Sequence, residues 1–207
     1  LSRDTLAAVG VPLLEEPAMC AEGIEDPGYD DVYSQLESYG RVFGRADEAE
    51  RAVEDLRQRV DELTAAPVGE RRTAAVLYPT VGGGVTYAYG TRSMAHPLLE
   101  AAGFDSVFGD TTKRVFEVTL EELLGRDPDV LILLHSAGDP AEVEAAVTDL
   151  PGAENLSAVR RQNLMPLLFN YVEPPTPDTG ATLLLIAPTP LSVDGLELVR
   201  ERFGPAL

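Results

Sequence analysis

The sequence predicts an α/β protein in which a parallel sheet, covered by helices on both faces, follows one long helix. Three segments between residues 73 and 169 are apolar throughout, and helix-like segments separate them: TAAVLY, DVLILL and LMPLLF. Strands without polar alternation are typical of a parallel sheet with both faces covered. The 207 residues are 44% hydrophobic and 25% charged, which is the composition of a globular protein.

Two helices are expected before Pro67. The first, at 28–44, has one apolar face, which Gly40 and Gly44 are expected to interrupt. That face consists of Val32, Leu36, Tyr39 and Phe43. The second, at 46–66, carries a narrow apolar stripe in an otherwise charged sequence, and Pro67 ends it. The stripe consists of Ala49, Val53, Leu56, Val60 and Leu63. Such a stripe can line a coiled coil or lie against a domain, and its short length favours the domain.

After Pro67, strands and helices alternate. Strands are expected at 73–78, 85–89, 106–108, 129–134 and 164–169. Helices are expected at 93–102, 120–126, 140–150, 155–160 and 192–203. Ser93 and Asp139 are the expected N-caps of two of these helices, and Gly103 is expected to end the first. The VGGGV segment follows a strand but matches neither phosphate-loop pattern, so we interpret it as a turn.

The short helix at 120–126 begins with two adjacent glutamates. Thr119 is its expected N-cap, and Thr119-x-x-Glu122 matches a capping box, in which Glu122 bonds back to the backbone N–H of Thr119. Glu121 has no such structural task. It gains only about 0.3–1 kcal/mol from the helix dipole, as any acid in the first turn would. From this pattern alone, a solvated side chain is the simplest interpretation of Glu121.

Ligands of parallel sheets bind beyond the carboxyl ends of the strands. The candidate ligand-binding residues at those ends and in the segment after the first strand are Tyr78, Tyr87, Tyr89, Arg92, Ser93, His135, Phe169 and Tyr171. Aromatic rings with one cation suit a bulky ligand that is anionic or rich in phenolate groups, although tyrosines that merely cover the sheet are an equally simple interpretation. Arg92 precedes a helix start, where the dipole also attracts anions. Lys113 and Arg114 lie in a loop whose direction the sequence leaves open.

The charge and the motif content argue against several classes of function. A formal net charge of −19 argues against nucleic acid and anionic membranes as partners. No apolar run reaches the length of a membrane-spanning helix, and the single Cys20 excludes an internal disulfide. His96 and His135 lack metal-ligand spacing and no nucleophile motif occurs, so we expect no metal, cofactor or enzyme activity. No charged start and apolar run open the chain, so we expect a signal segment to be absent from it.

Five stretches, taken in order, resemble the solute-binding proteins of ABC importers for ferric siderophores, haem or cobalamin. They are LAAVGVPLLEE (6–16), YSQLESYGRVFGRADEAERAVEDLRQRVDEL (33–63), SMAHPLLEAAGFDSVFGD (93–110), VFEVTLEELLGRDPDVLILL (115–134) and AENLSAVRRQNLMPL (153–167). In that family, one long helix joins two αβ lobes and the ligand lies between them. The resemblance implies a remnant of the N-terminal lobe at 1–45, the interlobe helix at 46–66 and the C-terminal αβ lobe at 67–207.

The resemblance also implies a function. It implies a monomeric, non-enzymatic protein that captures an iron chelate outside the cytoplasm, in the periplasm or lipid-anchored at the cell surface, and delivers it to an ABC permease. In the family, a glutamate at the position of Glu121 meets arginines of the permease, which implies a docking role for Glu121. A ferric siderophore is the favoured ligand. Haem stays open because Tyr78, Tyr171 and His135 could bind its iron, and cobalamin stays open as well.

Two departures from the family pattern shape these expectations. The chain starts almost at the last strand of the first lobe, so we expect most of that lobe, and one of two docking carboxylates, to be missing. The motif PTP occurs at 175–177 and again at 188–190, and residues 178–190 look inserted before the last helix. An extra edge strand and a disordered loop both fit this insertion. An enzyme or sensor built on a related αβ lobe is the alternative of another class, which the absence of catalytic motifs disfavours.

Overall fold

The computed structural model describes residues 3–14, 24–82, 84–136, 138–173 and 191–204. Its centre is a six-stranded sheet in the order β4–β2–β1–β5–β6, with the short β3 paired to β1. The strands are β1 (Thr73–Pro79), β2 (Thr86–Tyr89), β3 (Asp105–Ser106), β4 (Val115–Val118), β5 (Val130–His135) and β6 (Leu164–Leu168). The predicted α/β class is confirmed, and each predicted strand is present within a few residues of its expected bounds.

The pairs of β1 with β3 and β5 and of β5 with β6 are parallel, as predicted, but β2 runs in the opposite direction. Tyr78 on β1 pairs with Tyr87 on β2 in antiparallel register, and β4 pairs antiparallel to β2. The connection at 80–85 is too short for a crossover, so β1 and β2 form a hairpin. Gly82 and Gly84 have φ angles of 72° and 69° in this connection, which confirms the predicted glycine turn.

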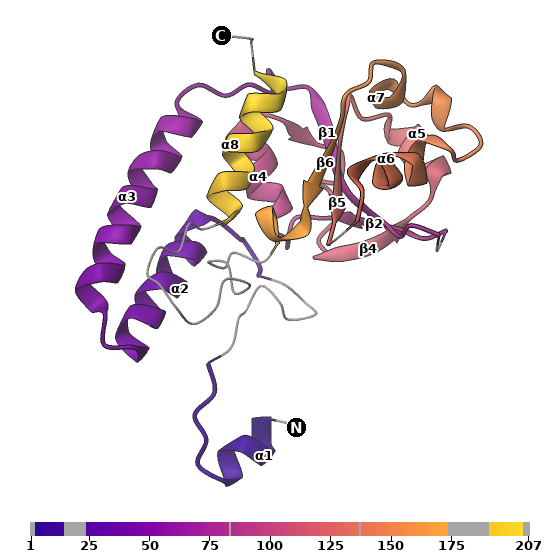
Figure 1. Ribbon diagram of the computed structural model, residues 1–207. Helices are drawn as coiled ribbons and strands as arrows, with labels where there is room; N and C mark the ends of the chain where they lie inside the picture. The colour runs from indigo at the N-terminus through magenta and orange to yellow at the C-terminus, as the bar shows by residue number, and fades with distance from the viewer. Residues whose placement is uncertain (1–2, 15–23, 83, 137, 174–190, 205–207) are drawn as a thin grey trace.

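Helices cover both faces of the sheet (Figure 1). One face packs against α4 (Ala95–Ala102) and α8 (Leu191–Phe203), and the other against α5 (Leu120–Arg126), α6 (Pro140–Thr148) and α7 (Ser157–Arg160). The side chains of β5 alternate between these two cores: Ile132 faces α4 and α8, and Leu133 faces α6, both fully buried. Burial of one such side chain contributes about 1.5–3 kcal/mol. The uniformly apolar sequence of β5 therefore follows from its central place.

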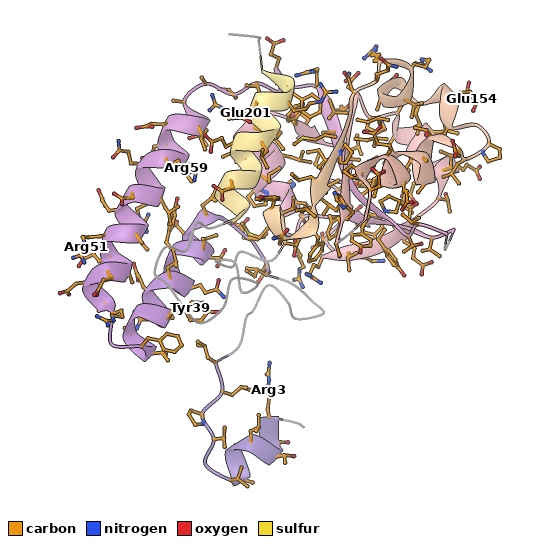
Figure 2. The ribbon with its side chains drawn as sticks, viewed as in Figure 1. Arg3, Tyr39, Arg51, Arg59, Glu154 and Glu201 are labelled. Carbon is orange, nitrogen blue, oxygen red and sulfur yellow. The ribbon has the colours of Figure 1, made fainter. Side chains whose placement is uncertain are left out.

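The helices before Pro67 form a hairpin beside the sheet. They are α2 (Tyr29–Val42) and α3 (Ala46–Thr64), and the short α1 (Arg3–Ala8) precedes them. The buried part of the α3 stripe packs against α2 and against one residue of the αβ lobe; this cluster contains Val32, Tyr33, Leu36, Val53, Leu56, Val60 and Met94. On the side of α3 that faces α8 (Figure 2), Arg59 pairs with Glu197 and, at 2.7 Å, with Asp194. The stripe thus packs mainly against α2 and reaches the αβ lobe at Met94, so the prediction that it lies against a domain is met only in part.

Two residues of this hairpin correct the predicted helix face. Gly40 lies inside α2 and does not interrupt it. A Cβ at Gly40 would lie 2.4 Å from the Cβ of Ala49, so glycine permits the two helices to approach closely. Phe43 is 68% exposed, because α2 ends at Val42 and the chain turns at Gly44, where φ is 66°.

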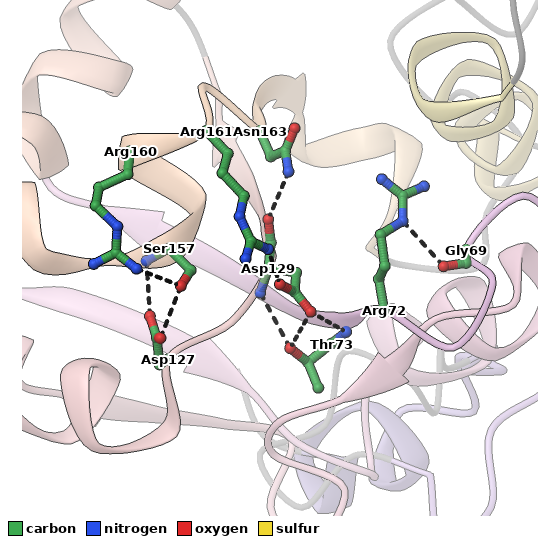
Figure 3. A network of polar contacts seen from close by, with 9 residues as sticks. All are labelled: Gly69, Arg72, Thr73, Asp127, Asp129, Ser157, Arg160, Arg161 and Asn163. Carbon is green, nitrogen blue, oxygen red and sulfur yellow. Dashed lines mark hydrogen bonds and ion pairs between the residues drawn. The ribbon is translucent and has the colours of Figure 1, made fainter.

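A polar network joins the amino ends of the central strands (Figure 3). The carboxylate of Asp129 accepts hydrogen bonds from the backbone N–H of Thr73 (3.2 Å) and from its hydroxyl (3.1 Å), and it pairs with Arg161. The carboxylate of Asp127 accepts from the backbone N–H of Ser157 (2.7 Å) and from its hydroxyl (2.8 Å). This network fixes the strands at their amino ends. A ligand is expected at the opposite end of the sheet, beyond the carboxyl ends of the strands.

The described part of the chain also contains the short 3₁₀ helices η2 (Ala153–Asn155) and η3 (Phe169–Tyr171), which follows β6. The insertion expected at 178–190 lies outside the described residues. Among the helices that the structure describes, none has the length and apolar character to cross a membrane.

Candidate functional site

The carboxyl ends of β1, β5 and β6 lie side by side at one end of the sheet, and we call this end the rim. Near the end of β1, the hydroxyl of Tyr78 shares a hydrogen bond of 2.9 Å with the hydroxyl of Ser136, which follows β5. The ring of Tyr78 also meets the ring of Phe169, which follows β6, edge to face with centroids 6.0 Å apart. Such a ring pair contributes about 0.5–1.5 kcal/mol beyond its burial. Three segments far apart in the sequence thus form one aromatic and polar surface.

Three further predicted residues belong to the rim. Tyr87 lies directly opposite Tyr78 in the β1–β2 pair, which places both side chains on the same face of the sheet. Tyr171 ends η3 and packs partly against the core. His135 ends β5, and its Nδ1 is buried without a hydrogen-bond partner in the described part of the chain. A ligand at the rim could supply that partner.

The other three predicted ligand-binding residues lie where the chain turns from β2 into α4. Tyr89 is only 6% exposed and packs in the core beneath α4, and burial raises its pKa. The hydroxyl of Ser93 donates to the carbonyl of Gly90 (3.1 Å) and accepts from the backbone N–H of Ala95 (3.2 Å) at the start of α4. Tyr89 and Ser93 are therefore buried side chains, and direct ligand contact by either stays a prediction. Arg92 is partly exposed at this corner and remains the cationic candidate.

Glu121 lies at the same edge of the sheet as the rim. Val118 at the end of β4 pairs with Thr86, and Thr86 pairs with Pro79 at the end of β1. The helix α5 therefore begins beside the carboxyl end of β1. Glu121, in the first turn of α5, is exposed, as expected of a residue that meets another protein.

The capping box of α5 forms in one direction only. The hydroxyl oxygen of Thr119 accepts the backbone N–H of Glu122 at 3.2 Å, as predicted. The carboxylate of Glu122 does not return to Thr119 but lies 3.8 Å from Nε of Arg126, one helical turn further on. Arg126 also lies over the ring of Phe108, 4.8 Å from its centroid. The helix that carries Glu121 is thus held at both ends, by the threonine cap and by Arg126.

Glu173 is a candidate that reasoning from the sequence missed. It is fully buried beyond η3, and its carboxylate accepts the backbone N–H of Met94 (2.7 Å) and Nη2 of Arg114 (3.2 Å). Burial raises the pKa of Glu173, although Arg114 and the N–H of Met94 both favour the carboxylate. The loop whose direction the sequence left open thus brings Arg114 inward. No sequence spacing indicates this contact, because Arg114 and Glu173 lie far apart and the third partner is a backbone group.

A cavity of about 410 Å³ lies at the opposite edge of the sheet, away from the rim. It is lined by Glu144, Thr148, Val159, Gln162, Leu164 and Arg202. We place the candidate site at the rim and not in this cavity, because Tyr78, His135 and Phe169 come together at the carboxyl ends of the strands, where ligands of parallel sheets bind. Over the same described residues, no three His, Cys, Asp or Glu side chains gather closely enough to hold a metal ion.

Comparison with known proteins supports this architecture. The family model of the periplasmic binding proteins matches residues 6–168. The chain is 53% identical, with a TM-score of 0.86, to the solved ABC-type Fe³⁺-hydroxamate transport system of Saccharomonospora viridis DSM 43017. The alignment covers 99% of this chain but only 66% of that one, so this chain spans about two thirds of its relative's length. No curated protein sequence matches the chain significantly.

Two more distant structures share the fold. The periplasmic haem-binding protein HutB of Vibrio cholerae is 13% identical, with a TM-score of 0.70, over 98% of this chain and 71% of that one. The periplasmic vitamin B12-binding protein BtuF of Vibrio cholerae is 16% identical, with a TM-score of 0.66, over 97% of this chain and 68% of that one. At such identities the likeness establishes the fold alone. The family model covers most of the chain, and the sheet and helices agree with it: the chain belongs to the periplasmic binding protein family.

Proposed function

We propose that this chain is the greater part of the solute-binding component of an ABC importer, and that it captures a ferric siderophore of the hydroxamate class for a permease. Solute-binding proteins of this family bind small ligands and are not enzymes, and family membership implies a location outside the cytoplasm. The observation that carries the ligand class is the 53% identity to the Fe³⁺-hydroxamate transport system, over nearly the whole chain.

Charge also supports a hydroxamate chelate. Three singly charged hydroxamates balance a ferric ion, whereas three doubly charged catecholates leave the chelate strongly anionic. A protein with a net charge of −19 repels a polyanion at long range. At the rim, Arg92 can donate hydrogen bonds to chelate oxygens, and the rings of Tyr78 and Phe169 offer apolar surface to the arms of the siderophore. The sequence led us to expect a bulky ligand that is anionic or rich in phenolate groups, and this proposal replaces that charge with a neutral one.

Fluorescence titration tests the ligand. The chain has seven tyrosines and no tryptophan, so its emission reports on tyrosine, and three of the seven lie at the rim. Ferrichrome, haemin and cyanocobalamin should be titrated separately, with ferrichrome expected to quench saturably. Quenching by haemin alone would favour a haem carrier, for which the partner-free Nδ1 of His135 is the supporting observation. If none of the three quenched saturably, the proposed function would be wrong for this chain.

Arg92→Ala tests the rim itself. Loss of a charged hydrogen bond costs about 1–3 kcal/mol, so ferrichrome should bind about five- to 150-fold more weakly. Arg51→Ala is the matched control, because Arg51 is exposed on α3 (Figure 2) and removes the same charge away from the rim. Equal affinities for both variants would remove Arg92 from the site.

Glu121→Ala tests the proposed docking to a permease. The exposed side chain can pair with an arginine of the permease, so its loss should weaken capture of the protein by permease-containing proteoliposomes while ferrichrome affinity is kept. Glu122→Ala is the control, because it removes the same charge one residue further along, where the carboxylate faces Arg126. If both variants lost capture equally, the effect would be one of net charge, and Glu121 would have no docking role of its own.

A further inference from the structure

A buried ion pair lies beneath the corner of the rim that carries Arg92. Glu173 is fully buried, and the side chain of Arg114 is 12% exposed. One carboxylate oxygen of Glu173 accepts the backbone N–H of Met94, and the other accepts Nη2 of Arg114. Burial raises the pKa of Glu173, although Arg114 and the N–H of Met94 favour its charged form. Glu173 therefore ties three segments together: the start of α4, the loop before β4 and the end of η3.

This ion pair lies close to the aromatic surface of the rim. Tyr89 interacts electrostatically with Glu173, with Arg114 and with Tyr78 of the rim. Glu173 also follows Tyr171 by only two residues, and Tyr171 ends η3 at the rim. A charge at Glu173 is thus both mechanically and electrostatically connected to the surface proposed to bind the ligand.

The negative charge of Glu173 has a consequence for the ligand. It offsets the positive charge of Arg114 at 3.2 Å, in surroundings where water screens neither group fully. A ligand bound over the pair then lies on a surface with almost no net charge, and Arg92 is the nearby cation. Without the carboxylate, one additional positive charge would lie beneath the rim and would attract anionic chelates.

We propose that Glu173 is a positioning and specificity-determining residue of the rim: it fixes the start of α4 beside Tyr171 and cancels the Arg114 charge, so that neutral chelates bind in preference to anionic ones. This inference rests on the proposed function, because it assumes that a ferric chelate binds at the rim. It differs from a purely structural role in one respect. A structural role affects all ligands alike, whereas a charge role alters their ratio.

The test compares two probes of similar bulk and different charge, ferrichrome and ferric enterobactin, by tyrosine quenching of the full 207-residue chain. Glu173→Gln keeps the size of the side chain and an oxygen that can accept the N–H of Met94, but removes the charge. Arg114→Gln removes the opposite charge, and the double variant removes both. One unit charge at about 10 Å, at an effective dielectric constant of about 20, changes the affinity for a charged ligand by roughly tenfold or more.

Because ferric enterobactin carries several negative charges, Glu173→Gln should raise the ratio of enterobactin to ferrichrome affinity at least about tenfold. Arg114→Gln should lower the ratio, and the double variant should return it close to that of the wild type. A change in stability cancels in this ratio, because both probes see the same folded fraction. If the wild type binds ferrichrome and the ratio is the same in all variants, the inference is wrong and the proposed function stands. If the wild type binds neither probe, both are wrong.

Discussion

Replacing Thr119 by alanine removes the side-chain oxygen that caps α5, the helix that carries Glu121. That oxygen accepts the backbone N–H of Glu122 at 3.2 Å, and Thr119 has the extended backbone of an N-cap residue. Loss of such a cap costs about 1 kcal/mol, within a range of roughly 0.5–2 kcal/mol. Thr119→Ser keeps the oxygen and should keep most of this stability.

The neighbouring substitution Glu122→Ala should cost less. The Glu122 carboxylate lies 3.8 Å from Nε of Arg126, and the two side chains are 42% and 27% exposed. An exposed pair at this helical spacing contributes only about 0.3–0.5 kcal/mol. A reciprocal capping box would make Glu122 a second capping group, with a cost similar to that of Thr119. In the structure only Thr119 caps the helix. Thr119→Ala should therefore lower the free energy of unfolding clearly more than Glu122→Ala does.

Urea unfolding followed by circular dichroism measures both variants, and equal m-values would show that the unfolded states are comparable. For a chain of this size, 1 kcal/mol corresponds to a shift of about 2–4 °C in Tm, which thermal unfolding resolves. If Glu122→Ala destabilised the protein as much as Thr119→Ala, the cap in one direction would be refuted. If Thr119→Ser behaved like Thr119→Ala, the hydroxyl would not be the capping group.

Two other predictions concern stability. Gly40→Ala should destabilise the α2–α3 hairpin by about 1–3 kcal/mol, because the new Cβ would lie 2.4 Å from that of Ala49. Gly125→Ala in α5, where a Cβ meets nothing within 4 Å, should instead be stabilising by up to about 1 kcal/mol, and the opposite order in thermal unfolding would contradict this account. Hydrogen bonds from Ser157 lower the pKa of Asp127, so this carboxylate stabilises the fold above its unfolded pKa of about 3.9 and loses that effect as the pH falls through its lower folded value. Asp127→Asn should therefore be less stable than the wild type at neutral pH, with a difference that narrows below about pH 4, and a difference independent of pH would refute the assignment.

The central strands are predictable from the sequence because burial on both faces leaves a direct record in it. The β5 segment is apolar from Val130 to Leu134, and every one of these residues is fully buried. Strand direction leaves no such record. The apolar pattern of β2 fits a parallel or an antiparallel neighbour equally well, and only the short glycine-rich connection from β1 shows that it must turn back. The expectation of a fully parallel sheet therefore failed at the two pairs that β2 makes, with β1 and with β4, and held elsewhere.

From the sequence, only those residues of the candidate site that stand at the ends of apolar strands can be predicted. Tyr78 and His135 stand at the ends of apolar strands, and Phe169 follows one, so the topology brings all three to the rim. Tyr89 lies only two residues from Tyr87 on the same face of β2. The register of β2 against β1 nevertheless places Tyr89 further from the carboxyl end of β1, in the core under α4. Depth along a strand is a tertiary property, which local sequence does not record. The same reason hides Glu173, whose partners come from two other segments.

The fold by itself does not select a ligand, because HutB and BtuF share it with this chain at 13% and 16% identity. Selection must then come from the side chains at the strand ends and from the charges beneath them. A siderophore arrives with its iron fully coordinated and needs no ligand atom from the protein, only matching surface, hydrogen bonds and charge. In the proposed site, the ring of Tyr78, fixed by Ser136 and Phe169, would supply surface, and Arg92 would supply hydrogen bonds. In our proposal, the buried carboxylate of Glu173 would offset the guanidinium of Arg114 and supply neutrality, so that a fully buried acid would bear on the same choice of ligand as the exposed rim.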